Sequence, residues 1–124
     1  MVQVVLSIGS NLDRNYVVSA INWLRNIISN PRFSGIYTTP SIHGTGDPYV
    51  NAVVIGKTRK SFEELNQLLK DYEKEQGRDN EARERGIVPI DIDIVIWNAE
   101  VVRPRDYCQK FFQIGFLELT CPVI

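Results

Sequence analysis

The order in which strand-like and helix-like segments follow one another is the feature that most restricts the fold of this chain. Two runs rich in β-branched and apolar residues, residues 2–8 and 49–57, are typical of strands. Between them, residues 14–29 place apolar side chains at helical spacing, and residues 33–39 favour another strand. Pro31 ends the helix, because the residue before a proline disfavours the helical conformation. The first half of the chain therefore reads strand, helix, strand, strand.

The second half adds one well-marked helix and one strand. Ser61 and Glu64 have the S-x-x-E spacing of a capping box, in which each side chain accepts a hydrogen bond from the other residue's backbone N–H. Gly77 marks the end of this helix, since glycine readily caps helix C-termini. Residues 78–89 are charged and lack an apolar period, which predicts a mobile loop, and residues 90–97 follow as a strand. The expected buried stripe of the helix consists of Leu65, Leu68, Leu69 and Tyr72.

Together these segments predict an α+β fold of the ferredoxin-like type. The order β-α-β-β-α-β is that of the split βαβ unit, which predicts one antiparallel sheet with both helices on one face and the other face open. A C-terminal extension follows, in which the apolar run 111–119 favours a last strand. The 124 residues, taken as a single domain over 1–124, are enough for one core and too few for two. Because this fold carries many functions, it does not select one.

Composition excludes several classes of function. The formal net charge of -1 argues against nucleic acid as a partner, since such binding needs a strong basic excess. No apolar run approaches the roughly 20 residues of a membrane span, and the N-terminus lacks the basic start of a signal peptide. Cys108 and Cys121 have no metal-type spacing, so we expect reduced thiols in a cytoplasmic protein. Nothing in the sequence indicates the oligomeric state.

Two aspartates, Asp91 and Asp93, interrupt the strand "IDIDIVIW". Residues i and i+2 of a strand point to one side, so these two share a face with Cα atoms about 6.5 Å apart, and Ile90, Ile92 and Ile94 take the opposite face. One interpretation is a strand solvated on one side. The other is a Mg²⁺ site, since Mg²⁺ prefers oxygen ligands and paired carboxylates serve two-metal phosphoryl transfer. Aspartate is a poor strand former and two on one face repel, which favours the metal site without excluding the first interpretation.

Several short motifs accompany this pair. "SIGSNLDRN" opens the chain, "YTTP" and "YVNAVV" lie on either side of a glycine-rich loop, and "EKEQGR" ends the second helix thirteen residues before Asp91. In this order and at this spacing, residues 2 to about 119 resemble the 6-hydroxymethyl-7,8-dihydropterin pyrophosphokinase family of folate biosynthesis. Members of that family usually extend further at the C-terminus.

The resemblance implies a diphosphate transferase that moves pyrophosphate from ATP to a dihydropterin hydroxymethyl group and releases AMP. It implies that Asp91 and Asp93 hold two Mg²⁺ ions, and that ATP and the pterin are the partners. The catalytic set implied by the resemblance is Asp91, Asp93, Arg78 and Lys110. The ATP contacts are Glu73, Arg78, Lys110 and the backbone of Ile94. The pterin contacts are Thr39, Pro40, Tyr49, Asn51 and Phe112.

The chain differs from the family pattern mainly in its positively charged residues. Where the family reads R-W-G-P-R-T-L-D-L-D, Arg85 takes the place of the tryptophan and Val88 that of the second arginine. Lys110 replaces an arginine in the R-x-F pair, and a Pro-His feature is missing, with Arg105 the nearest substitute. Losing one such charge-stabilising group costs about 100- to 1000-fold in rate. Arg83, Arg85 and Arg105 are candidates to compensate.

Two alternatives therefore stay open. One is a catalytically weakened or inactive homologue that binds a pterin or a nucleotide. The other is a protein- or RNA-binding module in which the aspartates have no ligand. The acidic balance of charges and the lack of aromatic stripes on the sheet argue against RNA as its partner. His43, the one histidine, is interpreted as a surface residue of the glycine-rich loop.

Overall fold

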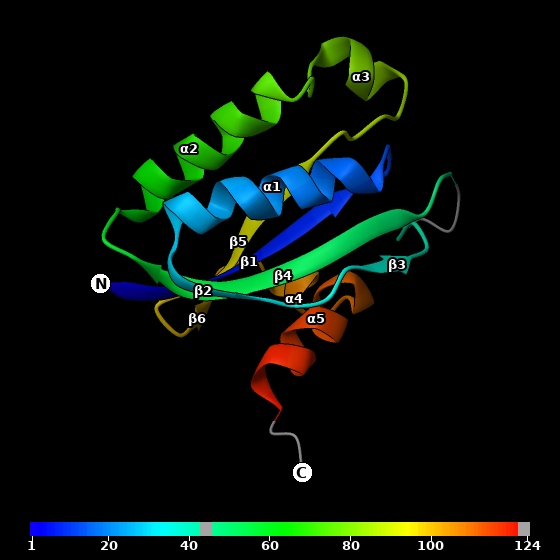
Figure 1. The fold of residues 1–124 in the computed structure, drawn as a ribbon. Coiled ribbons are helices and arrows are strands. Elements are labelled where there is room, and N and C mark those ends of the chain that lie inside the picture. The colour runs from blue at the N-terminus through cyan, green and yellow to red at the C-terminus, as the bar shows by residue number, and fades with distance from the viewer. Residues whose placement is uncertain (43–45, 122–124) are drawn as a thin grey trace.

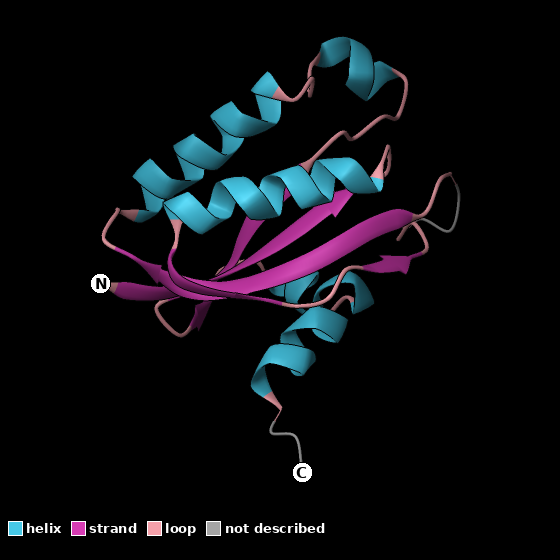
Figure 2. Cartoon of the chain, viewed as in Figure 1, coloured by secondary structure: helices cyan, strands magenta, loops and turns pink. Residues whose placement is uncertain are grey.

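A computed structural model describes residues 1–42 and 46–121, and its centre is one antiparallel sheet (Figures 1 and 2). The sheet order is β2-β4-β1-β5-β6, with β3 also paired to β4. The strands are β1 (Val2–Ser10), β2 (Ser29–Phe33), β3 (Tyr37–Thr39), β4 (Tyr49–Thr58), β5 (Asp91–Trp97) and β6 (Glu100–Val101). The helices are α1 (Arg14–Ile27), α2 (Phe62–Glu75), α3 (Asn80–Glu84), α4 (Pro104–Tyr107) and α5 (Lys110–Thr120). His43 lies outside the described residues.

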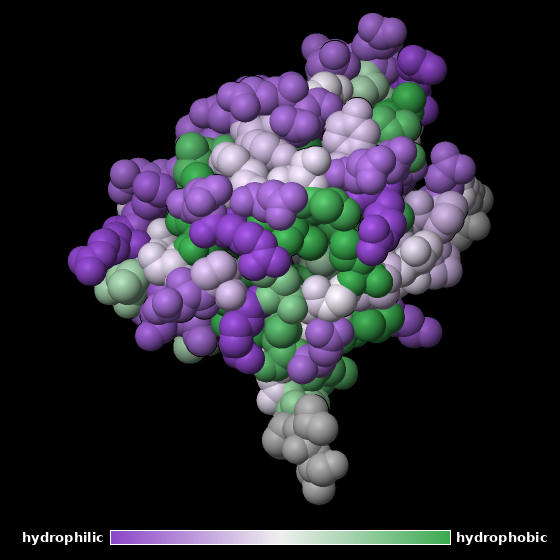
Figure 3. Space-filling model, viewed as in Figure 1, coloured by the Kyte–Doolittle hydropathy of each residue, from purple (hydrophilic) through white to green (hydrophobic). Residues whose placement is uncertain are grey.

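The two helices α1 and α2 pack on one face of the sheet (Figure 1). Alternate residues of the central strand, Val4, Leu6 and Ile8, point into this layer, and Ile92 and Ile94 join them from β5. The capping box of α2 is present, with Glu64 N–H donating to Ser61 Oγ and Ser61 N–H donating to Glu64 Oε1. Figure 3 shows hydrophobic side chains gathered in the middle of this view, where α1 meets the sheet. The α+β, ferredoxin-like prediction is therefore confirmed.

The expectation of an open second face is wrong. α4 and α5 lie under the sheet on the side opposite α1 and α2 (Figure 1), and Phe112 of α5 is fully buried against Val5, Val53 and Val95. The predicted strand over 111–119 is accordingly a helix. Its apolar residues that pack on the sheet side, Phe112, Phe116 and Leu119, stand three or four positions apart as in a helix, while Ile114 and Leu117 are exposed.

Two boundaries also differ from the sequence prediction. The first helix ends at Ile27, and the expected single strand 33–39 is two strands, β2 and β3. The backbone is already extended at Ile28, so β2 begins at Ser29, before Pro31, and Asn30, with a positive φ of 49°, lies in the irregular pairing between Ser29 and Arg32. Ser34 then separates the two strands and bonds to β4, with its Oγ accepting from Val53 N–H. Because tertiary bonds to β4 set these ends, local helix and strand preferences misplace them.

The segment 78–89 contains a helical turn where the sequence predicts only a mobile loop. Asp79 caps α3, with its Oδ1 accepting from Ala82 N–H at 2.8 Å. The Asn11 side chain then joins this segment to the turn after β1, since it donates to Gly86 O and accepts from Val88 N–H. Charged residues with no apolar period gave no sign of this contact, because it consists of hydrogen bonds with Ser10 and Asn11, which are far away in the sequence.

Candidate active site

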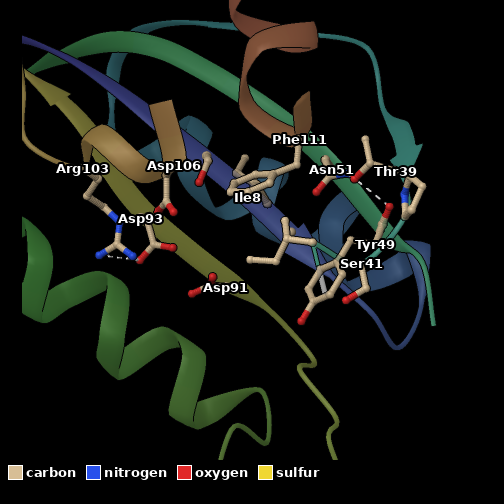
Figure 4. Close-up of a pocket in the computed structure, with 14 residues that line it drawn as sticks. Ile8, Thr39, Ser41, Tyr49, Asn51, Asp91, Asp93, Arg103, Asp106 and Phe111 are labelled. Carbon is tan, nitrogen blue, oxygen red and sulfur yellow. Dashed lines mark hydrogen bonds and ion pairs between the residues drawn. The ribbon is translucent and has the colours of Figure 1, made fainter. Parts of the chain in front are cut away.

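The second face of the sheet carries a cavity where α5 leaves the strands uncovered (Figure 4). Its volume is about 190 Å³, below the roughly 300–1,000 Å³ of drug-sized ligand pockets, so its enclosed part suits one ring system rather than two whole substrates. The cavity is lined by Ser7, Ile8, Gly9, Thr39, Pro40, Ser41, Ile42, Tyr49, Asn51, Asp91, Asp93, Arg103, Asp106 and Phe111.

Strand register explains why a cavity forms here. Gly9 of β1 pairs with Asn51 of β4 on one side and with Asp91 of β5 on the other. Two residues along β1, and therefore on the same face, Ser7 pairs with Asp93. Small residues in the middle strand leave the polar side chains on both neighbouring strands facing shared space. A Cβ on Gly9 would lie 3.4 Å from Asn51 Oδ1, so this position has little room for a larger side chain.

One half of the cavity is acidic. Asp93 is only 7% exposed, and Asp91 and Asp106 line the same wall (Figure 4). Burial, and then the neighbouring Asp91 charge, raise the pKa of Asp93 above its ordinary value. Two ionised carboxylates here therefore require cations to balance them.

Basic side chains supply part of that balance. Lys70 of α2 places its Nζ 3.0 Å from Asp93 Oδ1 and 3.9 Å from Asp91 Oδ1. Arg78 Nη1 lies 2.6 Å from Asp91 Oδ1, and Arg103 Nη1 lies 3.8 Å from Asp93 Oδ1. Burial alone would lower the pKa of Lys70, but Asp93 and the other carboxylates outweigh it and raise that pKa. The ammonium therefore stays protonated at neutral pH.

The carboxylates suit a hard cation of the Mg²⁺ type. Asp91 and Asp93 leave one strand on the same face and offer only oxygen donors to the cavity. Within residues 1–42 and 46–121 no group of three His, Cys, Asp or Glu side chains is arranged to hold a metal ion. Mg²⁺ commonly takes only one or two carboxylates and completes its octahedron with substrate phosphate and water oxygens. The donor set therefore fits Mg²⁺ bound together with a phosphate substrate.

The other half of the cavity is aromatic and amide-lined. Asn51 is 2% exposed and its Nδ2 donates to Thr39 Oγ1 at 2.9 Å and to Tyr49 O at 3.1 Å. The rings of Tyr49 and Phe111 line the space beside it (Figure 4). Tyr37 holds the start of α5 in place, because its hydroxyl donates to Phe111 O and accepts from Gly115 N–H. A flat heterocycle with polar edges matches aromatic faces and a fixed amide.

The cavity brings together six of the residues singled out from the sequence, namely Thr39, Pro40, Tyr49, Asn51, Asp91 and Asp93. Glu73 and Arg78 lie next to it in the ion-pair cluster. Lys110 is exposed at the start of α5, and the Ile94 side chain lies in the core under α1 and α2, which leaves only its backbone for a ligand. Phe112 is fully buried in the second core.

Four charged or aromatic side chains at the site were not predicted from the sequence: Lys70, Arg103, Asp106 and Phe111. Lys70 could have been found, because it stands three residues before Glu73 on the same face of a well-predicted helix. Arg103, rather than Arg83, Arg85 or Arg105, is the arginine that lies against Asp93. Its position depends on α4, a four-residue helix with no apolar pattern, so local sequence gave no sign of it.

Side chains of α2 also hydrogen-bond to the backbone of β5 at its free edge, through Glu73 and Lys70. Glu73 is 3% exposed, and its Oε2 accepts from Ile92 N–H at 2.8 Å, while Lys70 Nζ donates to Ile92 O at 3.1 Å. Glu73 Oε1 accepts from Arg78 Nη1 at 2.9 Å. The side chains of α2 thus satisfy backbone groups that a neighbouring strand would otherwise pair.

Replacing Glu73 with alanine is expected to lower the free energy of unfolding by about 2–4 kcal/mol. Removing one partner of a buried ion pair costs about 3–5 kcal/mol. The expected loss is smaller here because the side chains of Lys70 and Arg78 are each about one-third exposed, so solvent screens the charges left without a partner. Urea denaturation measures the change. Glu75→Ala, at an exposed position on the same helix, is the control and should stay within about 0.5 kcal/mol of the wild type. Equal effects of the two substitutions would show that the Glu73 contacts do not stabilise the fold.

The fold and the cavity define a class: a ferredoxin-like α+β protein with paired carboxylates beside an aromatic and amide-lined pocket. The family model described as 7,8-dihydro-6-hydroxymethylpterin-pyrophosphokinase (HPPK) matches residues 5–121. This chain belongs to that family.

Two relatives from Arabidopsis thaliana are similar to the chain. One is a "Folate synthesis bifunctional protein" and the other a "Folate synthesis bifunctional protein, mitochondrial". Each is 34% identical over 99 residues, which cover 77% of this chain. The matched region covers 20% of the first relative and 18% of the second, so the chain spans about a fifth of the length of these proteins. Among the described residues no helix is long and apolar enough to cross a membrane.

Proposed function

We propose that this chain catalyses the Mg²⁺-dependent transfer of pyrophosphate from ATP to 6-hydroxymethyl-7,8-dihydropterin. The observation that carries the proposal is the rung Asn51–Gly9–Asp91, which sets the amide of the aromatic half and a carboxylate of the acidic half on β4 and β5, the two strands that flank β1. Strands about 4.8 Å apart put these two residues about 10 Å from one another. A ring bound beside Asn51 would therefore direct its substituent toward the aspartates.

The reaction needs positioning and charge neutralisation rather than covalent help from the protein. The hydroxymethyl oxygen attacks the β-phosphorus of ATP, the bond from that phosphorus to the α–β bridging oxygen breaks, AMP leaves, and the hydroxyl proton passes to solvent. Asp91 and Asp93 would hold Mg²⁺, which supplies charge neutralisation at the phosphates when bound. Tyr49, Asn51 and Phe111 would orient the pterin.

Basic residues near the carboxylates support ATP as the donor. A second hollow adjoins Tyr49 and is lined in part by Lys74, Arg78 and Arg83. Arg103 Nη1 lies 3.8 Å from Asp93 Oδ1, whereas the sequence offered Arg105 as the nearest substitute cation. Arginines beside both carboxylates, Arg78 at Asp91 and Arg103 at Asp93, suit a triphosphate that shares its metal with the protein.

AMP release tests the proposal. The purified chain is incubated with ATP, Mg²⁺ and 6-hydroxymethyl-7,8-dihydropterin, and nucleotides are separated by anion-exchange chromatography. AMP is expected only when all three are present. Omitting the pterin, and adding EDTA, are the two controls. No pterin-dependent AMP from a folded sample would overturn the enzymatic proposal.

A weakened or inactive homologue is the second candidate, and Val88 favours it. This apolar residue stands where the family pattern has an arginine, and it lines the second hollow beside Arg78. Isothermal titration with the pterin and with ATP distinguishes this candidate from the enzyme, because binding without turnover supports it. Turnover at a rate sensitive to Arg103→Ala would instead support an enzyme in which Arg103 supplies the charge.

A further inference from the structure

We propose that Lys70 is a built-in counter-ion that competes with the divalent cation for Asp93. The inference rests on the metal site of the proposed function and concerns how that site is regulated. The Lys70 ammonium and a metal ion at Asp93 Oδ1 exclude one another. Metal binding in the absence of nucleotide is then weak, because the ammonium must first leave.

The contacts of Lys70 saturate its ammonium group. Nζ donates to Asp93 Oδ1 at 3.0 Å, to Glu73 Oε2 at 3.0 Å and to Ile92 O at 3.1 Å. An ammonium has three N–H donors, so all three are used. These acceptors come from β5 and from α2 itself, which fixes the charge between helix and strand. Such a geometry holds Lys70 against the carboxylates rather than in solvent.

Without a metal, the charges of the cluster already come within one unit of balance. Four carboxylates, Glu73, Asp91, Asp93 and Asp106, are paired with three cations, Lys70, Arg78 and Arg103. A divalent ion entering this group would add two positive charges beside side chains that are themselves positive. Like charges at this distance repel strongly in a partly buried site, so a cation must move for the metal to bind.

Lys70 is the cation that a metal ion at Asp93 Oδ1 would displace. It lies on the oxygen that a metal would need, whereas Arg103 Nη1 is 3.8 Å from the same atom. Arg78 is held by both Glu73 and Asp91. Lysine carries a point charge on a flexible four-carbon stem, and a nucleotide phosphate would give that charge a new partner. Metal binding is therefore expected to be coupled to nucleotide binding through Lys70.

Direct metal binding tests the inference without reference to turnover. Mn²⁺ serves as the probe, and the signal of free Mn²⁺ in electron paramagnetic resonance reports binding to the protein without nucleotide. Lys70→Gln removes the charge and keeps a donor for Ile92 O. It is expected to lower the Kd for Mn²⁺ at least about tenfold, a change of about 1.4 kcal/mol. Lys70→Arg, which keeps the charge, should bind as weakly as the wild type.

Lys60→Gln is the matched control, since it removes the same charge at an exposed position just before the other end of α2. It should leave the Kd unchanged, and circular dichroism checks that each variant is folded. If Lys70→Gln does not fold, Lys70→Met takes its place, because it keeps an unbranched stem and removes the charge.

The outcomes separate this inference from the proposed function. Equal, measurable Mn²⁺ affinity in the wild type and in Lys70→Gln would overturn the counter-ion role and leave the metal site standing. Absence of Mn²⁺ binding in every variant, with and without ATP, would overturn the metal site and the inference together. Tighter binding in Lys70→Gln supports the inference, whatever the rate of AMP release.

Discussion

Asp93→Asn is expected to reduce pterin-dependent AMP release at least about 100- to 1000-fold and to leave the protein no less stable than the wild type. The amide keeps the shape of the side chain but is a much poorer ligand for a hard cation than a carboxylate. Asp93 is buried beside Asp91, and the amide removes the negative charge that this environment disfavours. Activity is followed as AMP, and stability by urea denaturation in EDTA.

The Asp93 carboxyl group also makes the stability of the protein depend on pH. Because the pKa of Asp93 is raised in the folded protein, the folded state binds the carboxyl proton more tightly than the unfolded chain does. The stability contributed by Asp93 is thus present below its unfolded pKa and is lost as the pH rises through the folded pKa. Asp93→Asn should remove this component of the pH profile. A variant that keeps its activity, or that loses several kcal/mol of stability at neutral pH, would show that Asp93 acts mainly as a structural partner of Lys70.

Phe112→Ala is expected to lower the free energy of unfolding by about 3–5 kcal/mol. The ring is fully buried, stacks on Phe116 with ring centroids 5.1 Å apart and lies 5.8 Å from Tyr107. This loss is a large part of the roughly 5–15 kcal/mol that stabilises a typical domain. Equilibrium unfolding in urea measures it.

The neighbouring substitution, Phe111→Ala, should act on the ligand instead. Phe111 is only partly buried and lines the cavity, so its removal is expected to cost about 1 kcal/mol of stability and to weaken pterin binding roughly tenfold. Calorimetric titration with the pterin measures the second effect. The contrary result would be a Phe112→Ala variant that folds normally and binds the pterin poorly, beside a Phe111→Ala variant that binds it well. Phe112, as the family resemblance implies, and not Phe111 would then be the ring that contacts the pterin.

Short-range patterns predicted most of the fold. The alternation of residues 90–97 placed Asp91 and Asp93 on one face and the isoleucines on the other, as the structure has them. The capping box located α2, and the order of elements indicated the antiparallel ferredoxin-like sheet. These features depend on contacts within a few residues, where side-chain periodicity and backbone hydrogen bonding leave few alternatives.

The sequence by itself determined which chemical groups this protein has available on β5, on α2 and just after α2: a carboxylate pair, Glu73 and Arg78, respectively. Tertiary structure decided which other groups meet them. Phe111 rather than Phe112 faces the cavity because the rotation of α5 about its axis is set by packing against the sheet and by the Tyr37 hydroxyl, 74 residues away from Phe111 in the chain. Arg103 reaches Asp93 from ten residues further along the chain, at the start of a four-residue helix without an apolar pattern. Such long-range contacts depend on how whole elements pack, and local spacing carries no information about that packing.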